Sequence, residues 1–170
     1  PKVGLKFMMK FEDDQGWPNT TASAEVEATT TKANAWETLT FDYAGILTSV
    51  DWYYLVMFME NGTMGDGGAN FTIYMDDITP SSSTSSSTIV DFEVAGTLSG
   101  FDGGSAEVIA NPDTTGNSSG KVVKLVKSSG QTWAGHKFTV ADKFKLDSES
   151  RLRVKVWSPK VGLKFMMKFE

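Results

Sequence analysis

The first twelve residues of the chain, PKVGLKFMMKFE, recur without a single change as its last twelve, Pro159 to Glu170. Separately diverged repeats do not stay identical over such an apolar, strand-like segment, so the two copies have one origin. Either the chain derives from a tandem array with a period of 158 residues (159 − 1), or it carries an engineered overlap. In both cases we expect that the fold unit does not start at residue 1.

Residues 81–88 divide the chain into two parts. This segment, SSSTSSST, contains no apolar side chain, and such a composition is typical of a flexible linker. We expect residues 89–170 to form the N-terminal part of a β-unit and residues 1–80 to form the C-terminal part of the same or the next unit. The linker then either closes a circular permutant within one molecule or joins successive units that exchange strands.

Apolar and polar residues alternate with a period of two through most of the chain, which indicates β-strands. Clusters of Gly, Asn, Asp and Pro, such as Gly100–Ser105, separate these segments and predict turns. The pattern predicts an all-β, antiparallel β-sandwich, most simply a jelly roll. A helical turn is expected only around Ala141–Leu146. The predicted strands are Pro1–Glu12, Glu25–Thr31, Trp36–Tyr43, Trp52–Glu60, Phe71–Ile78, Ile89–Glu93, Ala106–Ala110, Lys121–Lys127, Lys137–Val140 and Arg151–Trp157.

Composition argues against several classes of function. The net charge is −5 and no basic stretch is interleaved with aromatic residues, so nucleic acid is not an expected partner. No apolar run is long enough to cross a bilayer. A single histidine, His136, and no cysteine leave little support for a catalytic triad or a metal hydrolase, so we do not expect an enzyme. The Ser/Thr linker and the abundant Thr, Gly and Asn favour a secreted or cell-surface bacterial protein.

Read in the order 89–170 and then 13–80, the chain resembles a known family. The motifs that carry the resemblance are IVDFE (89–93), NPDTTGNSSGKVVKLVK (111–127), QTWAG (131–135), VKVWSPK (154–160), LKFMMKFE (163–170), AWETLTFDYAG (35–45) and FTIYMDDIT (71–79). They resemble the jelly-roll carbohydrate-binding modules of the superfamily that includes module families four and twenty-two. Such modules occur beside glycoside hydrolases in marine and other polysaccharide-degrading bacteria. The resemblance implies a non-catalytic β-sandwich that binds a polysaccharide, often carries structural calcium, and is also used as a tandem repeat in surface proteins.

Four acidic residues are candidates for a calcium site. Asp91 and Glu93 lie on the first predicted strand of the reordered unit, and Asp76 and Asp77 end its last strand. If these strands are neighbours, their carboxylates meet, and oxygen ligands suit Ca²⁺. The resemblance implies this role for Glu93 and Asp76 first, with Asp77 and Asp91 beside them. The alternative is that these are solvated acids at strand ends.

Aromatic residues are the candidates for sugar contact, because sugars stack their C–H faces on exposed rings. Trp17 lies in the loop sequence GWPNT, and Trp133 follows a glycine-containing turn with Gln131 and His136 nearby as hydrogen-bonding groups. For both tryptophans, packing at the sandwich edge is the alternative to sugar binding.

The remaining aromatic residues are assigned from strand alternation. Trp52 and Tyr54 are expected on the core face with Val56 and Phe58, which leaves Tyr53 pointing outward as a candidate ligand contact. Trp157 is a further candidate, and its side of the strand is left open. For Trp36 and Trp52, packing is favoured over binding.

Two functions remain open at this stage. The first is binding of a polysaccharide such as a β-glucan by aromatic stacking. The second is a structural role as the tandem-repeat unit of a bacterial surface adhesin or filament, assembled through its linkers or by strand exchange with neighbouring copies. The family-like motifs support the first, and the duplicated segment with the interposed linker supports the second.

Overall fold

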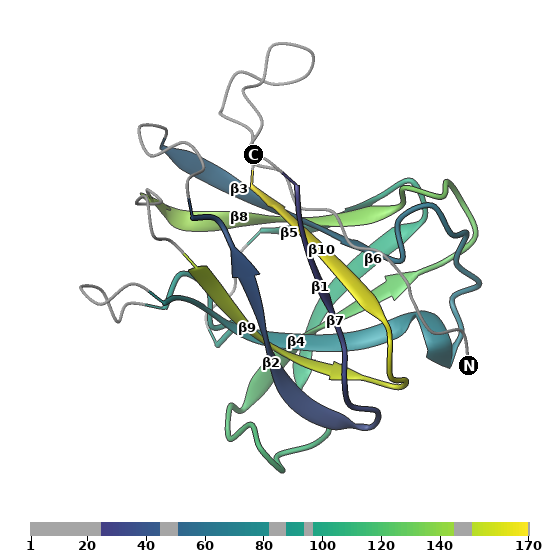
Figure 1. Ribbon diagram of the computed structural model, residues 1–170, viewed down its shortest axis with the longest axis horizontal. Coiled ribbons are helices and arrows are strands. Elements are labelled where there is room, and N and C mark those ends of the chain that lie inside the picture. The colour runs from purple at the N-terminus through teal and green to yellow at the C-terminus, as the bar shows by residue number, and fades with distance from the viewer. Residues whose placement is uncertain (1–24, 45–50, 82–87, 94–96, 145–150, 170) are drawn as a thin grey trace.

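The computed structural model describes residues 25–44, 51–81, 88–93, 97–144 and 151–169. Over these residues the protein is all-β with antiparallel sheets, and its only helical element is the short 3₁₀ turn η1 (Ala69–Phe71) (Figure 1). The strands are β1 (Val26–Thr29), β2 (Ala35–Asp42), β3 (Trp52–Met59), β4 (Thr72–Pro80), β5 (Leu98–Phe101), β6 (Gly104–Ala110), β7 (Lys121–Lys127), β8 (Gly135–Phe144), β9 (Arg151–Ser158) and β10 (Lys164–Phe169).

The strands form two five-stranded sheets. Sheet I has the order β1-β10-β3-β8-β5, and sheet II has the order β2-β9-β4-β7-β6. Each sheet contains strands from both sides of the linker. In sheet I, β10 lies between β1 and β3, and in sheet II, β9 lies between β2 and β4. The two parts of the chain therefore complete the same pair of sheets within one molecule.

Strand alternation builds one core from both sheets. In β9, Leu152, Val154 and Val156 are buried, whereas Arg151 and Arg153 are exposed. A single apolar cluster unites side chains of β3 and β8 from sheet I with side chains of β2, β4, β7 and β9 from sheet II. Burial of each large apolar side chain contributes about 1.5–3 kcal/mol. The shared cluster makes the arrangement sandwich-like.

The start of β3 differs from the expected alternation. A register shift between Trp52 and Tyr54 lets Trp52 remain in the core while Leu55 and Met57, rather than Tyr54, continue the buried face. The prediction that Trp52 and Tyr54 share the core face is therefore wrong. Tyr54 is half-buried, and the Lys137 ammonium lies 3.8 Å from the centre of its ring. A bulge moves each later side chain to the opposite face, which simple alternation does not foresee.

Three other segments depart from the prediction. Residues 89–93 form no regular strand and make only the bridge Ile78↔Val90. Ala141–Phe144 complete β8 instead of beginning a helical turn. Strand β5 falls partly in the predicted turn cluster Gly100–Ser105, because the turn itself occupies only Asp102 and Gly103. Both have positive φ, 54° and 108°, and the turn leads the chain from β5 in sheet I to β6 in sheet II.

The two ends of the linker lie side by side. Ile78 donates its backbone N–H to the Val90 oxygen at 2.8 Å, and Ile89 donates to the Ile78 oxygen at 2.7 Å. Residues 82–87 between them lie outside the described residues. The end of β4 thus lies beside Ile89 and Val90, at the start of the first predicted strand of the reordered unit. Among the described residues, no helix has the length and apolar character needed to cross a membrane.

Candidate functional site

Trp133 lies on the loop between β7 and β8, and this loop rests on the β5–β6 turn. Its side chain is 51% exposed, and its indole N–H donates to Asp102 Oδ2 at 3.0 Å. The backbone N–H of Gln131 donates to the Asp102 carbonyl oxygen at 2.8 Å, and that of Ser128 donates to the Gly103 oxygen at 2.8 Å. We call Asp102, Gln131 and Trp133 the loop cluster. The ring is exposed but held at its edge.

A glycine allows this close contact between loop and turn. A Cβ added to Gly130 would collide with the carbonyl oxygen of Asp102. The backbone of the β7–β8 loop therefore approaches the turn more closely than any other residue type permits. The position of Trp133 follows from this contact.

A buried lysine, Lys127, binds the loop between β7 and β8. Lys127 is fully buried, and its ammonium donates to the carbonyl oxygens of Met59 at 2.9 Å, Glu60 at 3.0 Å and Thr132 at 2.8 Å. Burial lowers the pKa of Lys127 to about 8, and the nearby Glu60 carboxylate acts in the opposite direction. The three carbonyl oxygens also favour the charged form. Lys127 thus ties the end of β3 to the residue that precedes Trp133.

His136 is part of the core and not of a ligand surface. It is fully buried on β8, and its Nε2 lies 3.1 Å from the Val126 oxygen. Burial lowers the pKa of His136 to about 4, so the ring is neutral at pH 7 and Nε2–H is the donor. The expectation that His136 offers a hydrogen bond to a ligand beside Trp133 is therefore wrong. Gln131, by contrast, is exposed.

A second aromatic group lies on the outer face of sheet II. Trp36 on β2 is opposite Trp157 on β9, which in turn is opposite Tyr74 on β4. The rings of Tyr74 and Trp157 are 5.2 Å apart between centroids. Trp36 is only 6% exposed, whereas Trp157 and Tyr74 are half-buried. We call these three residues the face cluster, and it settles the open question of which side of β9 carries Trp157.

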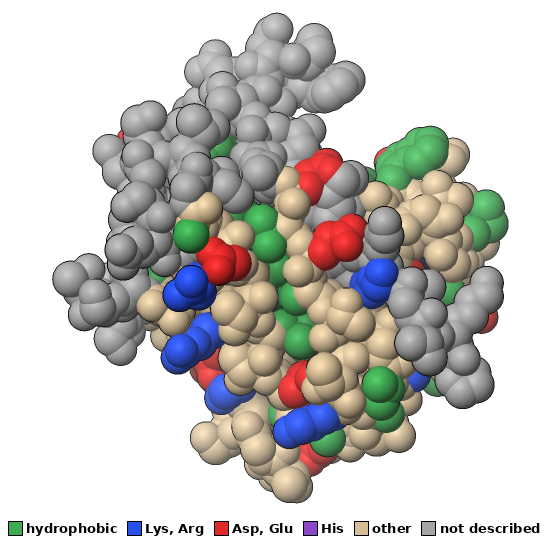
Figure 2. All heavy atoms as spheres, viewed as in Figure 1, with side chains coloured by type: hydrophobic (Ala, Val, Ile, Leu, Met, Phe, Trp, Pro, Cys, Tyr) green, Lys and Arg blue, Asp and Glu red, His purple; other side chains and the backbone are tan. Residues whose placement is uncertain are grey.

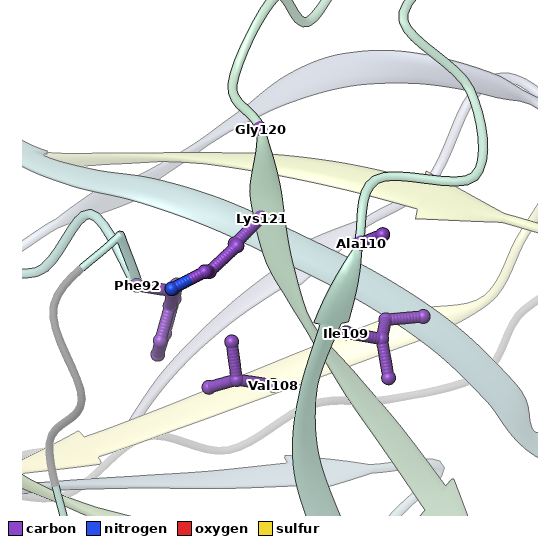
Figure 3. A pocket seen from close by; sticks show the side chains of 6 residues that line it. All are labelled: Phe92, Val108, Ile109, Ala110, Gly120 and Lys121. Atoms are coloured by element: carbon purple, nitrogen blue, oxygen red, sulfur yellow. The ribbon is translucent and has the colours of Figure 1, made fainter.

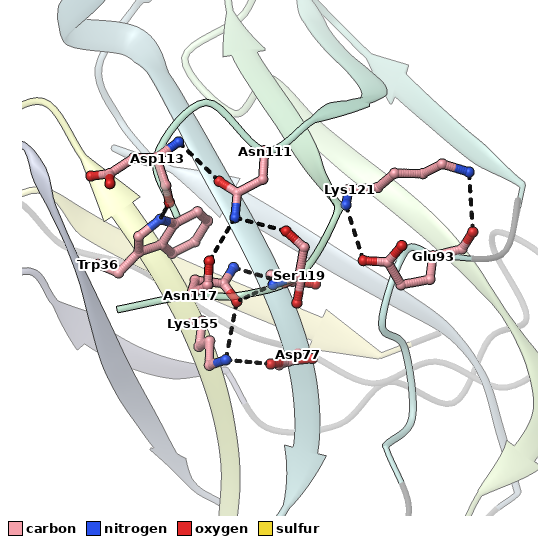
Figure 4. Close-up of polar contacts among 10 residues, drawn as sticks. Trp36, Asp77, Glu93, Asn111, Asp113, Asn117, Ser119, Lys121 and Lys155 are labelled. Carbon is pink, nitrogen blue, oxygen red and sulfur yellow. Dashed lines mark hydrogen bonds and ion pairs between the residues drawn. The ribbon is translucent and has the colours of Figure 1, made fainter. Parts of the chain in front are cut away.

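The loop between β6 and β7 folds against the face cluster. Trp36 donates its indole N–H to the Asp113 carbonyl oxygen at 2.6 Å (Figure 4). Trp157 donates its indole N–H to Asp113 Oδ2 at 3.2 Å. Asn111 holds the loop closed by donating to the carbonyl oxygens of Asn117 at 2.9 Å and Ser119 at 3.1 Å. Asp113 therefore orients both indole rings.

Two of the calcium candidates lie under the same loop. Asp76 is fully buried, and its Oδ2 accepts a hydrogen bond from the Asn117 amide at 2.8 Å. Its Oδ1 makes no hydrogen bond in the part of the chain that is described, and burial raises the pKa of this carboxyl. Asp77 pairs with the Lys155 ammonium at 2.6 Å, which also donates to Asn117 Oδ1 at 3.1 Å. A lysine ammonium thus already supplies positive charge beside these acids.

The other two calcium candidates are exposed. Glu93 Oε1 accepts the backbone N–H of Lys121 at 3.0 Å, and Asp91 Oδ1 accepts that of Glu93 at 3.1 Å. Figure 4 shows Glu93 beside Lys121, apart from the contacts of Asp77. Within the described ranges, no three acidic or histidine side chains gather as a set of metal ligands. The calcium site stays a prediction.

A pocket of about 460 Å³ opens between the 88–93 segment and the hairpin of β6 and β7 (Figure 3). Its lining is mainly apolar, and Lys121 donates from its ammonium to the Glu93 carbonyl oxygen at 3.3 Å at its rim. The lining residues are Phe92, Val108, Ile109, Ala110, Gly120 and Lys121. None of the three tryptophans of the two clusters lines this pocket.

The remaining sequence candidates fall in different places. Trp17 lies outside the described residues. Tyr53 is half-buried, with its ring 6.3 Å from that of Tyr54, and it belongs to neither cluster. Sequence reasoning did not single out Tyr74 or Asp113. Alternation with the buried Ile73 and Met75 would have placed Tyr74 outward, but no sequence signal shows which loop residue reaches the two indoles.

The face of the molecule seen in Figure 2 mixes both signs of charge, with Lys and Arg side chains next to Asp and Glu side chains and apolar groups between them. Comparison with protein-family profiles, with curated proteins and with solved structures finds no match to this chain.

Proposed function

We propose that this protein is a non-catalytic carbohydrate-binding module that holds a polysaccharide, such as a β-glucan, against Trp133. In this proposal the fold is a jelly-roll sandwich in circularly permuted order. The observation that carries the function is an indole ring that is 51% exposed and yet fixed through its N–H to Asp102. We propose that the protein is secreted by a bacterium or lies on its cell surface.

The chemistry of the loop cluster suits a sugar. Because the indole N–H is already bound to Asp102, a ligand meets the face of the ring, where the C–H groups of a pyranose pack best. The side chain of Gln131 is exposed and provides an amide donor and acceptor for hydroxyl groups. Trp157 and Tyr74 are the alternative stacking surface, although each is partly covered.

Isothermal titration and affinity electrophoresis against a panel of β-glucans and other polysaccharides test the proposal. We expect Trp133→Ala to weaken the binding of the recognised glycan at least about tenfold, as the loss of a central aromatic contact does, and to change stability little. Trp157→Ala is the matched variant for the face cluster and should leave affinity within about twofold of the wild-type value. Failure of every glycan to bind, or a loss confined to Trp157→Ala, would overturn the assignment to Trp133.

We further propose that Ca²⁺ binds where the end of β4 meets the 88–93 segment, with Asp76 and Glu93 as ligands and Asp77 and Asp91 beside them. The support is the buried Asp76 Oδ1, which makes no hydrogen bond in the described part of the chain. A bound ion would stabilise the folded state by mass action. The melting temperature should therefore fall in chelator and recover with added calcium. An unchanged melting temperature rejects the site.

The second candidate function is structural, as the repeat unit of a bacterial surface adhesin or filament. It is favoured by the duplicated segment, whose C-terminal copy supplies an inner strand of sheet I. Light scattering separates the candidates, because concentration-dependent growth beyond 18.5 kDa is expected only for an assembling unit. A monomer that binds a glycan would support carbohydrate binding and would exclude the assembling repeat unit.

A further inference from the structure

Strand β10 is an inner strand of sheet I, and both of its edges are paired. It pairs with β1 over Val26–Thr29 and with β3 over Leu55–Met59. Among the strands that the structure describes, β10 is the only one paired with β1. Without β10, β1 would lose its place in the sheet and one edge of β3 would be open. We call the space between β1 and β3 the strand slot.

The residues just before β10 are bound at the entrance of the slot by Thr30. The backbone N–H of Thr30 donates to the Leu163 oxygen at 2.7 Å, and its hydroxyl accepts from the Leu163 N–H at 2.7 Å. Gly162 donates to the Thr30 oxygen at 2.8 Å, and the Thr30 hydroxyl donates to the Lys160 oxygen at 3.1 Å. Contacts with the slot therefore extend from Lys160 to Phe169.

The duplicated segment is almost coextensive with this stretch. Residues 159–170 recur as residues 1–12, so residues 2–11 carry the same side chains in the same order as residues 160–169. The duplication exceeds the bound stretch by one residue at each end. Residues 2–11 can consequently make every contact of the slot in the same register.

We propose that the strand slot accepts either copy, and that residues 2–11 of the same chain are its second occupant. The observed occupant is joined to β9, whereas residues 2–11 would be joined to β1. In the register of β10, Met9 would lie opposite Val26, because Met167 does so. Residues 12–25 would then form a hairpin loop between two antiparallel neighbours, and loops of such length cost only slightly more to close than shorter ones.

The slot is on this view a recognition site for a peptide strand. The paired ladders on both edges provide affinity, and the buried Leu163, a member of the core cluster, provides specificity. One slot and two copies leave one copy over in each chain. This inference depends on neither the glycan site nor the calcium site.

Two shortened chains test the idea as a matched pair. Residues 13–170 keep only the C-terminal copy and residues 1–158 keep only the N-terminal copy, so both have the same composition and mass. We expect both to be monomers with cooperative urea unfolding and closely similar midpoints. Residues 13–158, which lack both copies, should show no cooperative transition until the peptide PKVGLKFMMKFE is added. The same peptide with Leu5→Asp should not restore it.

The full chain provides the sharper test. Leu163→Asp should abolish cooperative unfolding in residues 13–170 but leave a cooperative transition in residues 1–170, where residues 2–11 take over the slot. Equal damage in both chains would overturn the proposal, as would an unfolded 1–158 chain. A folded 1–158 chain at twice the monomer mass would overturn the assignment to the same chain and identify a second copy as the source of the strand.

Discussion

The loop cluster and the face cluster both hold an indole N–H on an aspartate, but they fix their rings by different means. Trp157 belongs to β9, and its neighbours Trp36 and Tyr74 lie opposite it in register on either side. Three strands orient the face cluster, and the β6–β7 loop then contacts it through Asp113. Strand pairing in sheet II therefore fixes the positions of the three rings. The rings are partly covered as a consequence.

Trp133 lies on a loop and not on a strand, so strand pairing does not fix the position of its ring. Its position depends on polar groups that are themselves buried: the Lys127 ammonium on three carbonyl oxygens and the neutral His136 ring on the Val126 oxygen. The close approach of Gly130 to the β5–β6 turn completes the support. Buried hydrogen bonds thus take the role that strand pairing has in the face cluster, and the ring face stays open. The more exposed ring therefore depends on the more deeply buried polar groups.

Among the substitutions that test this comparison, Lys127→Met should cause the largest loss of stability. The substitution fills similar volume but leaves three buried carbonyl oxygens without their donor, and we expect a loss of about 3–5 kcal/mol in the free energy of unfolding. Urea denaturation measures it. Lys124→Met on the same strand is the control, because Lys124 lies at the surface and pairs with Glu107 at 2.8 Å, a contact worth about 0–1 kcal/mol. Equal losses in the two variants would show that the carbonyl contacts of Lys127 do not support the fold.

His136 should make the protein sensitive to acid. Its pKa in the folded state, about 4, lies below the ordinary 6.5, so the unfolded chain binds more protons between these values. Stability is therefore lost as the pH falls from about 6.5 to about 4, by at most about 3 kcal/mol. Thermal unfolding measured across this range should show the loss in the wild type.

His136→Gln supplies the control for this acid effect. The raised pKa values of Asp76 and Glu60, caused by burial, act with the opposite sign, since protonation then favours the folded state. Both carboxyls remain in the variant, so the difference between the two curves isolates the histidine. Parallel curves for wild type and variant would contradict a buried neutral ring.

Much of the fold could be predicted from alternation, and the departures have physical reasons. Strands β2 and β9 follow the pattern closely, because one face of each packs into the core. Alternation does not predict strand β5, although the positive φ of Asp102 and Gly103 marks the turn that ends it. The short sequence Leu98–Phe101 becomes a strand only through its pairing with β8. The bulge in β3 likewise depends on its partner strand.

The candidate site was less accessible to sequence reasoning. The sequence predicts exposure of Trp133 as one of two possibilities, because this residue follows a glycine-containing turn with Gln131 nearby as a hydrogen-bonding group. The burial of Lys127 was not anticipated, since its three acceptors come from residues 59, 60 and 132, far apart in the sequence. Alternation identifies the face of a strand, but it does not show which carbonyl groups converge there.

Gly130→Ala tests the contact between loop and turn directly. The added methyl group meets the backbone oxygen of Asp102, which cannot rotate away, so the loop must shift. We expect a loss of about 1–3 kcal/mol in stability and a weaker affinity for whichever glycan the wild type binds. Gly120→Ala is the control, since its Cβ would find its nearest atom, Glu93 Oε2, at 3.5 Å. Retention of full affinity by Gly130→Ala would mean that the glycan does not use the loop cluster.

Asp113→Ala should have the smallest effect and addresses the face cluster alone. It removes the carboxylate that accepts the Trp157 N–H at 3.2 Å and the Thr115 N–H at 2.8 Å, but it keeps the carbonyl oxygen that accepts the Trp36 N–H. We expect a loss of about 0.5–1.5 kcal/mol, recovered only in part in Asp113→Asn, whose single amide oxygen can accept one of the two N–H groups. Glycan affinity should not change, because the ring of Trp133 has no part in this contact. A drop in glycan affinity with unchanged stability would show that the glycan binds to Trp157 and Tyr74 and not to the loop cluster.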